Sequence, residues 1–183
     1  MTIIYSNSGD DDCLVLQRVL RNIPNVKLIE ITDESKNWED VVDNAISEET
    51  DTLLFLGHGT THGLLFPNFN MDEYILHENN INLIKAKNVI CCWCYASTFC
   101  EKHHLKAFAT SMFISNVHEA YDNGCYDFSQ DDINKNGEKF YDEVNYLLRN
   151  HIDLKDWIMR LGAHMDIEND VDIFNRQGLV LCD

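Results

Sequence analysis

The chain has 183 residues, of which 45% are hydrophobic and 25% are charged, as is ordinary for a globular domain. Its formal net charge of −17 argues against binding to nucleic-acid phosphates or to anionic membrane surfaces. The same charge is compatible with a cationic substrate or partner, although many acidic proteins are simply soluble. This length predicts one domain over residues 1–183.

The start of the chain and its cysteines predict a cellular setting. The first residues have neither the basic flank nor the apolar length of a signal peptide, and no apolar stretch reaches the roughly 18 residues of a membrane span. We therefore expect a cytoplasmic protein. Its seven cysteines are odd in number and four of them crowd between residues 91 and 100, so we expect free thiols rather than a disulfide framework.

Short apolar runs alternate with amphipathic segments at the start of the chain. Residues 2–5, 27–31 and 52–56 predict strands, and residues 14–20 and 38–46 predict helices between them. The third strand is apolar on both faces, as in the centre of a parallel sheet. This order indicates an α/β domain with a mostly parallel sheet flanked by helices.

The rest of the chain predicts shorter elements. Further strands are predicted at residues 63–67, 87–93, 111–117 and 178–181. Further helices are predicted at residues 80–86, 99–109, 137–149 and 154–165. Residues 121–136 are polar and rich in Gly, Asn and Asp, which predicts a long loop.

Two of the predicted strands end in groups that can carry chemistry. The third strand runs into His58 within Gly-His-Gly, and the fourth ends at Cys94. Catalytic groups of open α/β sheets gather beyond the carboxyl ends of the strands. If these strands are neighbours, the imidazole and the thiol form a Cys–His dyad, in which the imidazole takes the thiol proton or pairs with the thiolate. Gly57 and Gly59 would let the backbone turn sharply towards a substrate, and the Gly59 amide would face a developing oxyanion.

The same residues have other readings. A lone histidine after a strand is more often a structural residue held by hydrogen bonds, and Cys91 and Cys92 are expected to be small buried residues of the core. A zinc site would use His58, His62 and Cys94. The glycine-rich sequence around the two histidines is not that of a helix, and the pair Cys91 and Cys94 has no matching second half, so no metal is expected.

The sequence resembles the caspase-like (clan CD) cysteine peptidases, and among them the CHAT-domain peptidases. The likeness covers most of residues 52–183 and extends more loosely over the first two strands. The His motif resembles 57-GHGTTHGLLFP-67 and the Cys motif 88-NVICCWCYAS-97. The later segments that carry the likeness are 111-SMFISNVHEA-120 as a strand, 140-FYDEVNYLL-148 as a helix and 171-VDIFNRQGLVLCD-183 as the terminal strand.

That resemblance implies a three-layer caspase-like fold and a cysteine endopeptidase without a cofactor. His58 would be the general base or ion-pair partner, Cys94 the nucleophile, and the amides of Gly59 and Cys94 the oxyanion hole. Two positions depart from the family pattern: Trp93 replaces a small residue, and residues 95–97 lack the expected glycine. The alternative is therefore a caspase-like binding module without activity, which docks a basic partner through its acidic face.

The resemblance also implies where specificity and regulation would lie. The pocket for the residue before the scissile bond would be built by the loop after the first strand, with Asp10 and Asp12, and by the segment after the fifth, with Glu119 and Asp122. Carboxylates there would favour Arg or Lys in a protein or peptide substrate, although residues 10–12 would equally serve to cap a helix. We expect regulation by a partner protein, often in bacterial defence, or by self-cleavage within residues 121–136.

Overall fold

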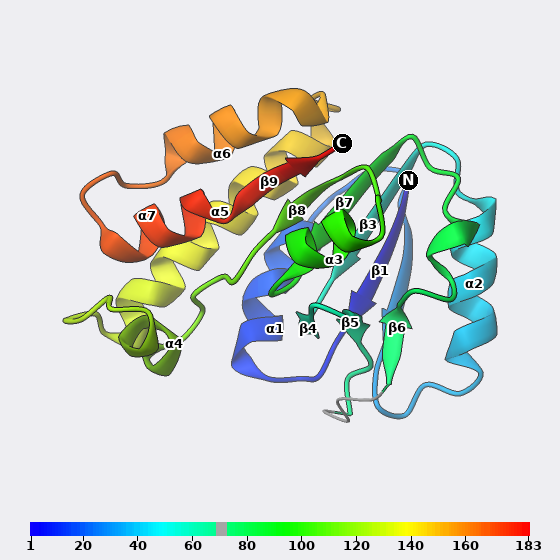
Figure 1. Cartoon of the computed structure of the whole chain (residues 1–183), viewed down its shortest axis with the longest axis horizontal. Helices are drawn as coiled ribbons and strands as arrows, with labels where there is room; N and C mark the ends of the chain where they lie inside the picture. The colour runs from blue at the N-terminus through cyan, green and yellow to red at the C-terminus, as the bar shows by residue number, and fades with distance from the viewer. Residues whose placement is uncertain (69–72) are drawn as a thin grey trace.

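The computed structural model describes residues 1–68 and 73–183. Within them the main sheet has six strands in the order β2-β1-β3-β7-β8-β9 (Figure 1). Neighbouring strands are parallel except β9, which runs antiparallel to β8. The strands are β1 (Thr2–Ser6), β2 (Lys27–Ile31), β3 (Thr52–Leu56), β7 (Asn88–Cys92), β8 (Ala107–Thr110) and β9 (Leu179–Cys182).

A small antiparallel sheet follows directly after β3. Its strands are β4 (Gly59–Thr60), β5 (Gly63–Leu65) and β6 (Tyr74–Leu76), in that order. Leu64 and Leu76 are fully buried in the same core as residues of the helices α2 (Trp38–Glu48) and α3 (Ala96–Lys102). The strand predicted at residues 63–67 is thus present as β5, whereas β6 was not foreseen.

Helices cover both faces of the main sheet. They are α1 (Asp11–Leu16), α2 (Trp38–Glu48), α3 (Ala96–Lys102), α4 (Val117–Asp122), α5 (Gln130–Arg149), α6 (Trp157–His164) and α7 (Asp170–Gln177), with 3₁₀ turns at Gln17–Leu20, Ile81–Leu83 and Leu154–Asp156. Residues of α2 and α3 share one core with the sheet, and residues of α1, α5 and α6 share the other. The protein is therefore α/β with a mostly parallel sheet between two helical layers, as the sequence predicts.

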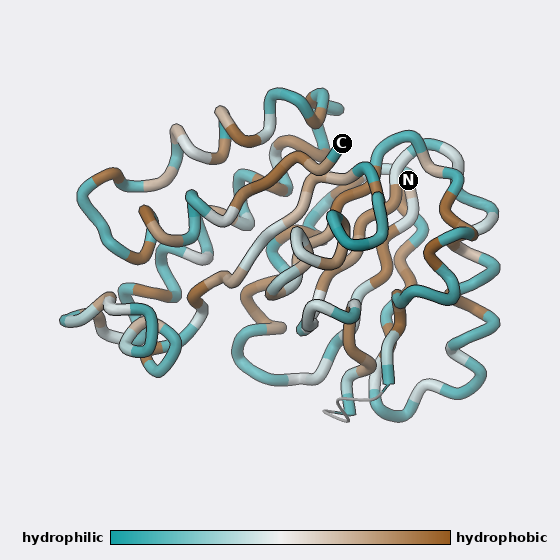
Figure 2. Tube along the Cα trace, in the orientation of Figure 1, coloured by the Kyte–Doolittle hydropathy of each residue, from teal (hydrophilic) through white to brown (hydrophobic). Residues whose placement is uncertain are grey.

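The strand β3 shows why this arrangement forms. Leu53 and Phe55 belong to the core beneath α2 and α3, and Leu54 and Leu56 belong to the core beneath α1, α5 and α6. All four side chains are fully buried, and burying each such side chain contributes about 1.5–3 kcal/mol to folding. Hydrophobic residues accordingly run along the central strands, while hydrophilic residues dominate the outer loops (Figure 2).

The predictions for residues 99–117 were wrong. The helix α3 begins earlier and ends at Lys102, and the fifth strand is β8 at Ala107–Thr110, not residues 111–117. Strand β8 is paired with β7 on one side and β9 on the other, so tertiary pairing overrides the weak strand propensity of its two alanines. The apolar run after it packs as an irregular segment, with the ring of Phe113 4.8 Å from that of Phe140 in α5.

The long loop predicted at residues 121–136 is also mostly helical. Helix α4 reaches Asp122, and α5 begins at Gln130 behind a capping box formed by Ser129 and Asp132. Residues 123–129 join them. The helix predicted at residues 80–86 is only a 3₁₀ turn, and α7 was not foreseen in the tail, of which Leu179–Cys182 alone is a strand.

Two further properties bear on the setting of the protein. None of the helices in the described part of the chain combines the length and the apolar character that a membrane crossing needs. The seven cysteines all carry free thiols, and six of them are buried. Cys94 is the half-buried exception.

Candidate active site

The strands that precede His58 and Cys94 are direct neighbours in the sheet. β3 pairs in parallel with β7, with Leu56 opposite Cys92, and the amide of Gly57 donates to the carbonyl of Cys92 at 3.4 Å. His58 and Cys94 each lie two residues beyond that last pair. The prediction that these two strands adjoin, and so bring both residues to one edge of the sheet, is confirmed.

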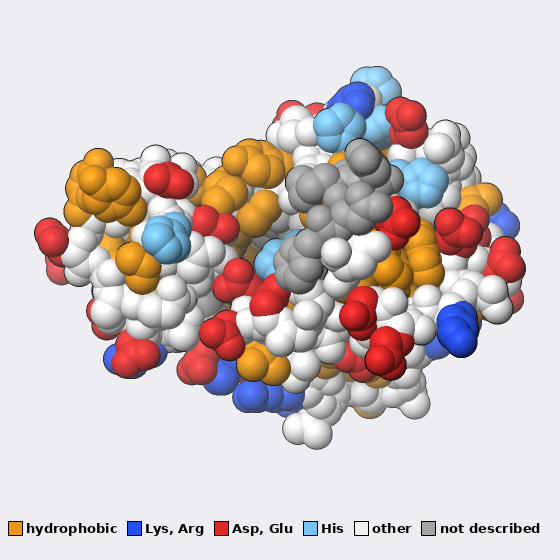
Figure 3. Space-filling model, turned by 90° about the horizontal axis from the view of Figure 1, so that it is seen from below, with side chains coloured by type: hydrophobic (Ala, Val, Ile, Leu, Met, Phe, Trp, Pro, Cys, Tyr) orange, Lys and Arg blue, Asp and Glu red, His pale blue; other side chains and the backbone are white. Residues whose placement is uncertain are grey.

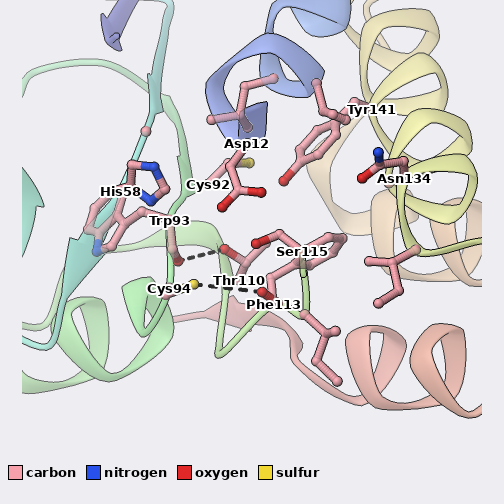
Figure 4. Close-up of a pocket in the computed structure, with 16 residues that line it drawn as sticks. Asp12, His58, Cys92, Trp93, Cys94, Thr110, Phe113, Ser115, Asn134 and Tyr141 are labelled. Atoms are coloured by element: carbon pink, nitrogen blue, oxygen red, sulfur yellow. Dashed lines mark hydrogen bonds between the residues drawn. The ribbon is translucent and has the colours of Figure 1, made fainter. Parts of the chain in front are cut away.

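Both side chains line one pocket at the carboxyl edge of the sheet (Figure 4). The pocket has a volume of about 50 Å³, which is room for about three or four water molecules. Its wall also includes Asp12, Ser115 and Tyr141. Seen from below (Figure 3), this face is hollowed near its centre and carboxylate side chains gather beside the hollow.

Asp10 and Cys13 contact the imidazole of His58. Nε2 of His58 lies 2.7 Å from Oδ2 of Asp10, and Sγ of Cys13 lies within 4.8 Å of the ligand atoms of both residues. The contact with Cys13 and the carboxylate of Asp10 raise the pKa of His58 to about 9, against the lowering effect of burial. His58 is therefore an imidazolium at neutral pH in this state.

The carboxylate of Asp10 has two structural duties besides this ion pair. It caps α1 by accepting a hydrogen bond from the amide of Cys13 at 2.8 Å, and it accepts another from the hydroxyl of Ser8 at 2.7 Å. Burial raises the pKa of Asp10, but these hydrogen bonds and His58 outweigh burial and lower it. The structure thus uses Asp10, predicted to bind substrate, to cap the helix and to fix the ring of His58.

The thiol of Cys94 lies at the pocket wall and is directed towards the segment after β8. Sγ is 3.8 Å from the carbonyl oxygen of Phe113, to which it donates. Burial raises the pKa of Cys94 to about 11, and the negative charges of Glu119 and Asp12 add to the rise. The thiol is thus protonated in this state, and its hydrogen bond is made to Phe113.

The residue before Cys94 supports the loop that carries His58. The indole of Trp93 is buried and its Nε1 donates to the carbonyl of Thr60 at 3.2 Å. A Cβ atom on Gly59 would lie 2.0 Å from Cδ1 of that indole, so only glycine fits there. Gly57 has a φ of +147° and its Cβ would lie 2.7 Å from Cβ of Ser6. These two glycines allow the chain to pack closely against Trp93 and Ser6. The sequence instead predicts that they let the backbone turn towards a substrate.

The two amides predicted for the oxyanion hole have different surroundings. The carbonyl of His58 accepts a hydrogen bond from the amide of Leu65 in β5. In an antiparallel pair successive residues point their backbone groups alternately towards and away from the partner strand, so the N–H of the next residue, Gly59, points away from β5. The amide of Cys94 has no acceptor within residues 1–68 and 73–183. Tyr95 follows in a left-handed conformation with φ +68°, which turns the chain into α3.

The four predicted specificity residues occupy different places. Asp12 lines the pocket, and burial raises its pKa although a hydrogen bond with Ser115 opposes the rise. Glu119 borders this region, where its Oε2 accepts from the amide and the hydroxyl of Ser115 at 2.8 and 3.0 Å. Asp122 is exposed at the end of α4 and Asp10 faces His58, so Asp12 is the one of these four carboxylates that lines the pocket.

The alternative zinc set of His58, His62 and Cys94 is not assembled. His62 is exposed in the turn between β4 and β5, with its ring centroid 6.2 Å from that of Tyr74. In its place the fold brings Cys13 to His58 and Asp10. Sequence reasoning missed Cys13 because neither its spacing nor its surroundings in the chain set it apart from the other cysteines.

No family model and no curated protein matches the chain. At this edge of the sheet its residues provide a thiol, an imidazole and a carboxylate around one pocket.

Proposed function

We propose that the protein is a cysteine endopeptidase of the caspase-like type, with motifs like those of CHAT-domain peptidases, in which Cys94 is the nucleophile and His58 its partner. One observation carries the proposal: the thiol and the imidazole follow adjacent parallel strands at the same register position and line the same pocket. Both residues extend from buried central strands, which hold catalytic groups more precisely than long loops do.

The order of the elements supports the caspase-like fold that the resemblance implies. The histidine follows the third strand of the main sheet and the cysteine the fourth, and a short terminal strand closes the sheet beyond the fifth. Helices lie on both faces. The departure at Trp93 is accommodated, because its indole packs against Gly59 and Thr60 of the histidine loop.

The chemistry follows from these groups. The imidazolium of His58 in the resting state first loses one proton to solvent. The neutral ring then accepts the proton of Cys94 as the sulfur attacks the peptide carbonyl, and the amides of Gly59 and Cys94 stabilise the oxyanion. The resulting imidazolium gives that proton to the leaving amine, and the C–N bond breaks to leave an acyl-enzyme. Water then attacks the thioester, His58 takes the proton from the water and returns it to the departing sulfur, and the enzyme is regenerated.

Asp12 supports a basic residue before the scissile bond. Its carboxylate lines the narrow pocket beside Cys94, and the two oxygens of a carboxylate match the fork of a guanidinium. A cation there would also offset the negative charges of Asp12 and Glu119 that act on the thiol. The substrate is thus a protein or peptide with Arg or Lys at this position.

The hydrogen bond of the Cys94 thiol to Phe113 supports a resting state of the enzyme, and with it regulation by a partner protein. Residues 123–129, between α4 and α5, are the part of the predicted 121–136 loop that remains outside helices, so self-cleavage would fall there.

Peptide-library profiling tests the function. Wild type should cleave after Arg or Lys, Cys94→Ala and His58→Ala should not, and Cys91→Ala should cleave like wild type because that thiol is fully buried in the core. Cleavage by Cys94→Ala that equals wild type would overturn the proposal.

An inactive binding module is the second candidate, favoured by the carboxylates beside the hollow in Figure 3. It predicts that wild type neither cleaves the library nor reacts at Cys94 with an arginyl electrophile, yet binds Arg- and Lys-rich peptides. Labelling of Cys94 that His58→Ala abolishes would exclude it.

A further inference from the structure

Asp10, Cys13 and His58 form a compact group at the edge of the candidate active site. Their ligand atoms all lie within 4.8 Å of one another, and no other group of three acidic, cysteine or histidine residues meets this limit in the described part of the chain. We propose that this group is a zinc site, in which the carboxylate of Asp10, the thiolate of Cys13 and Nε2 of His58 hold one Zn²⁺.

The three ligand atoms, all within 4.8 Å of one another, would reach the spacing of a bound zinc by shifts of about 1 Å or less. Zinc bonds of 2.0–2.3 Å in a tetrahedron place ligand atoms about 3.2–3.8 Å apart. The distance between Nε2 of His58 and Oδ2 of Asp10 is 2.7 Å, and it would have to increase by about 0.5 Å to reach that spacing. The hydroxyl of Ser8 lies 3.1 Å from Sγ of Cys13 and 2.7 Å from Oδ2 of Asp10, where it or a water molecule would complete the tetrahedron.

The ligand types fit zinc rather than a harder ion. Sulfur, imidazole nitrogen and a single carboxylate are the donors that zinc takes in proteins, whereas calcium and magnesium require oxygen. A thiolate and a carboxylate carry two negative charges, which balance the charge of Zn²⁺. Zinc takes cysteine as the thiolate and histidine as the neutral imidazole, so binding would release a proton from the His58 imidazolium.

The surrounding contacts hold two of the ligands in place before any metal arrives. The amide of Cys13 donates to Oδ1 of Asp10, and the hydroxyl of Tyr5 donates to the carbonyl of Cys13 at 2.7 Å. Such supporting hydrogen bonds orient metal ligands and raise affinity. Cys13 is fully buried, which argues against a second nucleophile there, while the side chains of His58 and Asp10 are 33% and 32% exposed and admit the ion.

The proposed zinc site and the proposed dyad compete for one imidazole. With Nε2 bound to zinc, His58 can neither accept the proton of Cys94 nor deliver one to the leaving amine. Zinc would therefore inhibit the peptidase reversibly. This consequence rests on the proposed function, whereas the metal site does not.

Metal binding is measured on Cys94→Ala protein, so that the result is independent of peptidase activity. Metal-free protein is titrated with Zn²⁺ against a chromophoric chelator, and with Co²⁺ to reveal the thiolate-to-cobalt absorption that a cysteine ligand produces. We expect one ion per chain and cobalt absorption. Adding Asp10→Asn, Cys13→Ser or His58→Ala should weaken zinc binding at least tenfold, and Cys13→Ser should abolish the cobalt band.

Two controls separate this site from the alternative set. Zinc affinity should be unchanged by His62→Ala and should be equal with or without Cys94→Ala. Circular dichroism checks that each variant folds. If Cys13→Ser does not fold, Asp10→Asn remains the test, because asparagine can still cap α1. Absence of bound zinc, unweakened binding by Asp10→Asn, or loss of binding in His62→Ala would overturn the site. Peptidase activity in wild type that saturating zinc leaves unchanged would overturn only its regulatory role.

Discussion

Two carboxylates at opposite ends of the central strands, Glu49 and Asp12, have different surroundings. At the amino end, the carboxylate of Glu49 accepts hydrogen bonds from Thr2 at 2.8 Å and from the amide of Asp51 at 2.9 Å, and lies 3.3 Å from the amino group of Met1. At the carboxyl end, Asp12 and Cys94 line a pocket instead. The protein thus pairs the carboxylate of Glu49 with the amino terminus at one end of the strands, whereas at the other end the carboxylate of Asp12 lines a pocket.

The pKa values follow this difference. Burial raises the pKa of Glu49, but its hydrogen bonds and the amino terminus outweigh burial and lower it to about 2. Burial raises the pKa of Asp12, and its hydrogen bond with Ser115 does not outweigh it. Glu49 therefore contributes to stability as an anion, whereas the anionic form of Asp12 would gain from a bound cation.

Removing the proposed nucleophile should affect activity alone. Cys94→Ala should lower kcat/KM at least about 10³-fold, since the nucleophile and its base act as a unit, and should change the unfolding free energy by less than about 1 kcal/mol because the thiol is only half-buried. Steady-state kinetics and chemical denaturation measure the two effects. A destabilisation that accounts for the lost activity would contradict this separation.

Gly59→Ala should damage the support of the active-site loop. The new methyl group would meet the indole of Trp93, and such overpacking costs about 1–3 kcal/mol. Gly137→Ala in α5 is the matched control, because its Cβ meets Val15 at an ordinary 3.5 Å and should be neutral or stabilising by about 0.5 kcal/mol. The denaturant midpoint should therefore fall in Gly59→Ala and should stay the same or rise in Gly137→Ala.

Glu49→Gln should remove the ion pair with the amino group of Met1 and weaken the hydrogen bonds of this side chain. The free energy of unfolding should fall by about 1–2 kcal/mol at pH 7. Because the pKa of Glu49 is lowered on folding, its contribution is full above its unfolded value near 4.5 and is lost as the pH falls towards 2. The difference between wild type and Glu49→Gln should therefore shrink over that range. Urea denaturation at pH 7 and below pH 4 measures it, and a difference that grows in acid would contradict the assignment.

Asp12→Asn should change the reactivity of Cys94 by a few fold. Removing a neighbouring negative charge lowers the pKa of the thiol, so alkylation by iodoacetamide at pH 7 should be faster. In wild type the rate should rise about tenfold per pH unit from pH 7 to 10, because the pKa of Cys94 is about 11. Mass spectrometry of the Cys94 peptide follows both rates, and the exposed Asp122→Asn is the control.

The parts of the fold that the sequence predicted are those with a strong local pattern. The bounds of β2 and β3 agree with the predictions, because five-residue runs with turns on both sides allow little else. The predictions for residues 99–117 were wrong because β8 is defined by its pairing with β9, which comes from the far end of the chain. Local propensity carries no information about such a partner.

The candidate site, too, could be predicted from the sequence only in part. The positions of His58 and Cys94 could be derived from strand ends, which sequence periodicity reveals. The pairing of Asp10 with His58 could not, because residues 10–12 are all aspartates and only the cap geometry decides which one faces the imidazole. The approach of Cys13 depends on how the loop after β1 folds back, and that loop has no sequence period.

Reaction of Cys94 with a peptide electrophile that carries arginine tests the central pairing of thiol and imidazole most directly. Intact-mass and peptide mapping should find one label per wild-type chain, on Cys94, and almost none in His58→Ala, while a lysine- or arginine-free electrophile labels slowly. Equal labelling of wild type and His58→Ala, or label on a cysteine other than Cys94, would contradict the pairing.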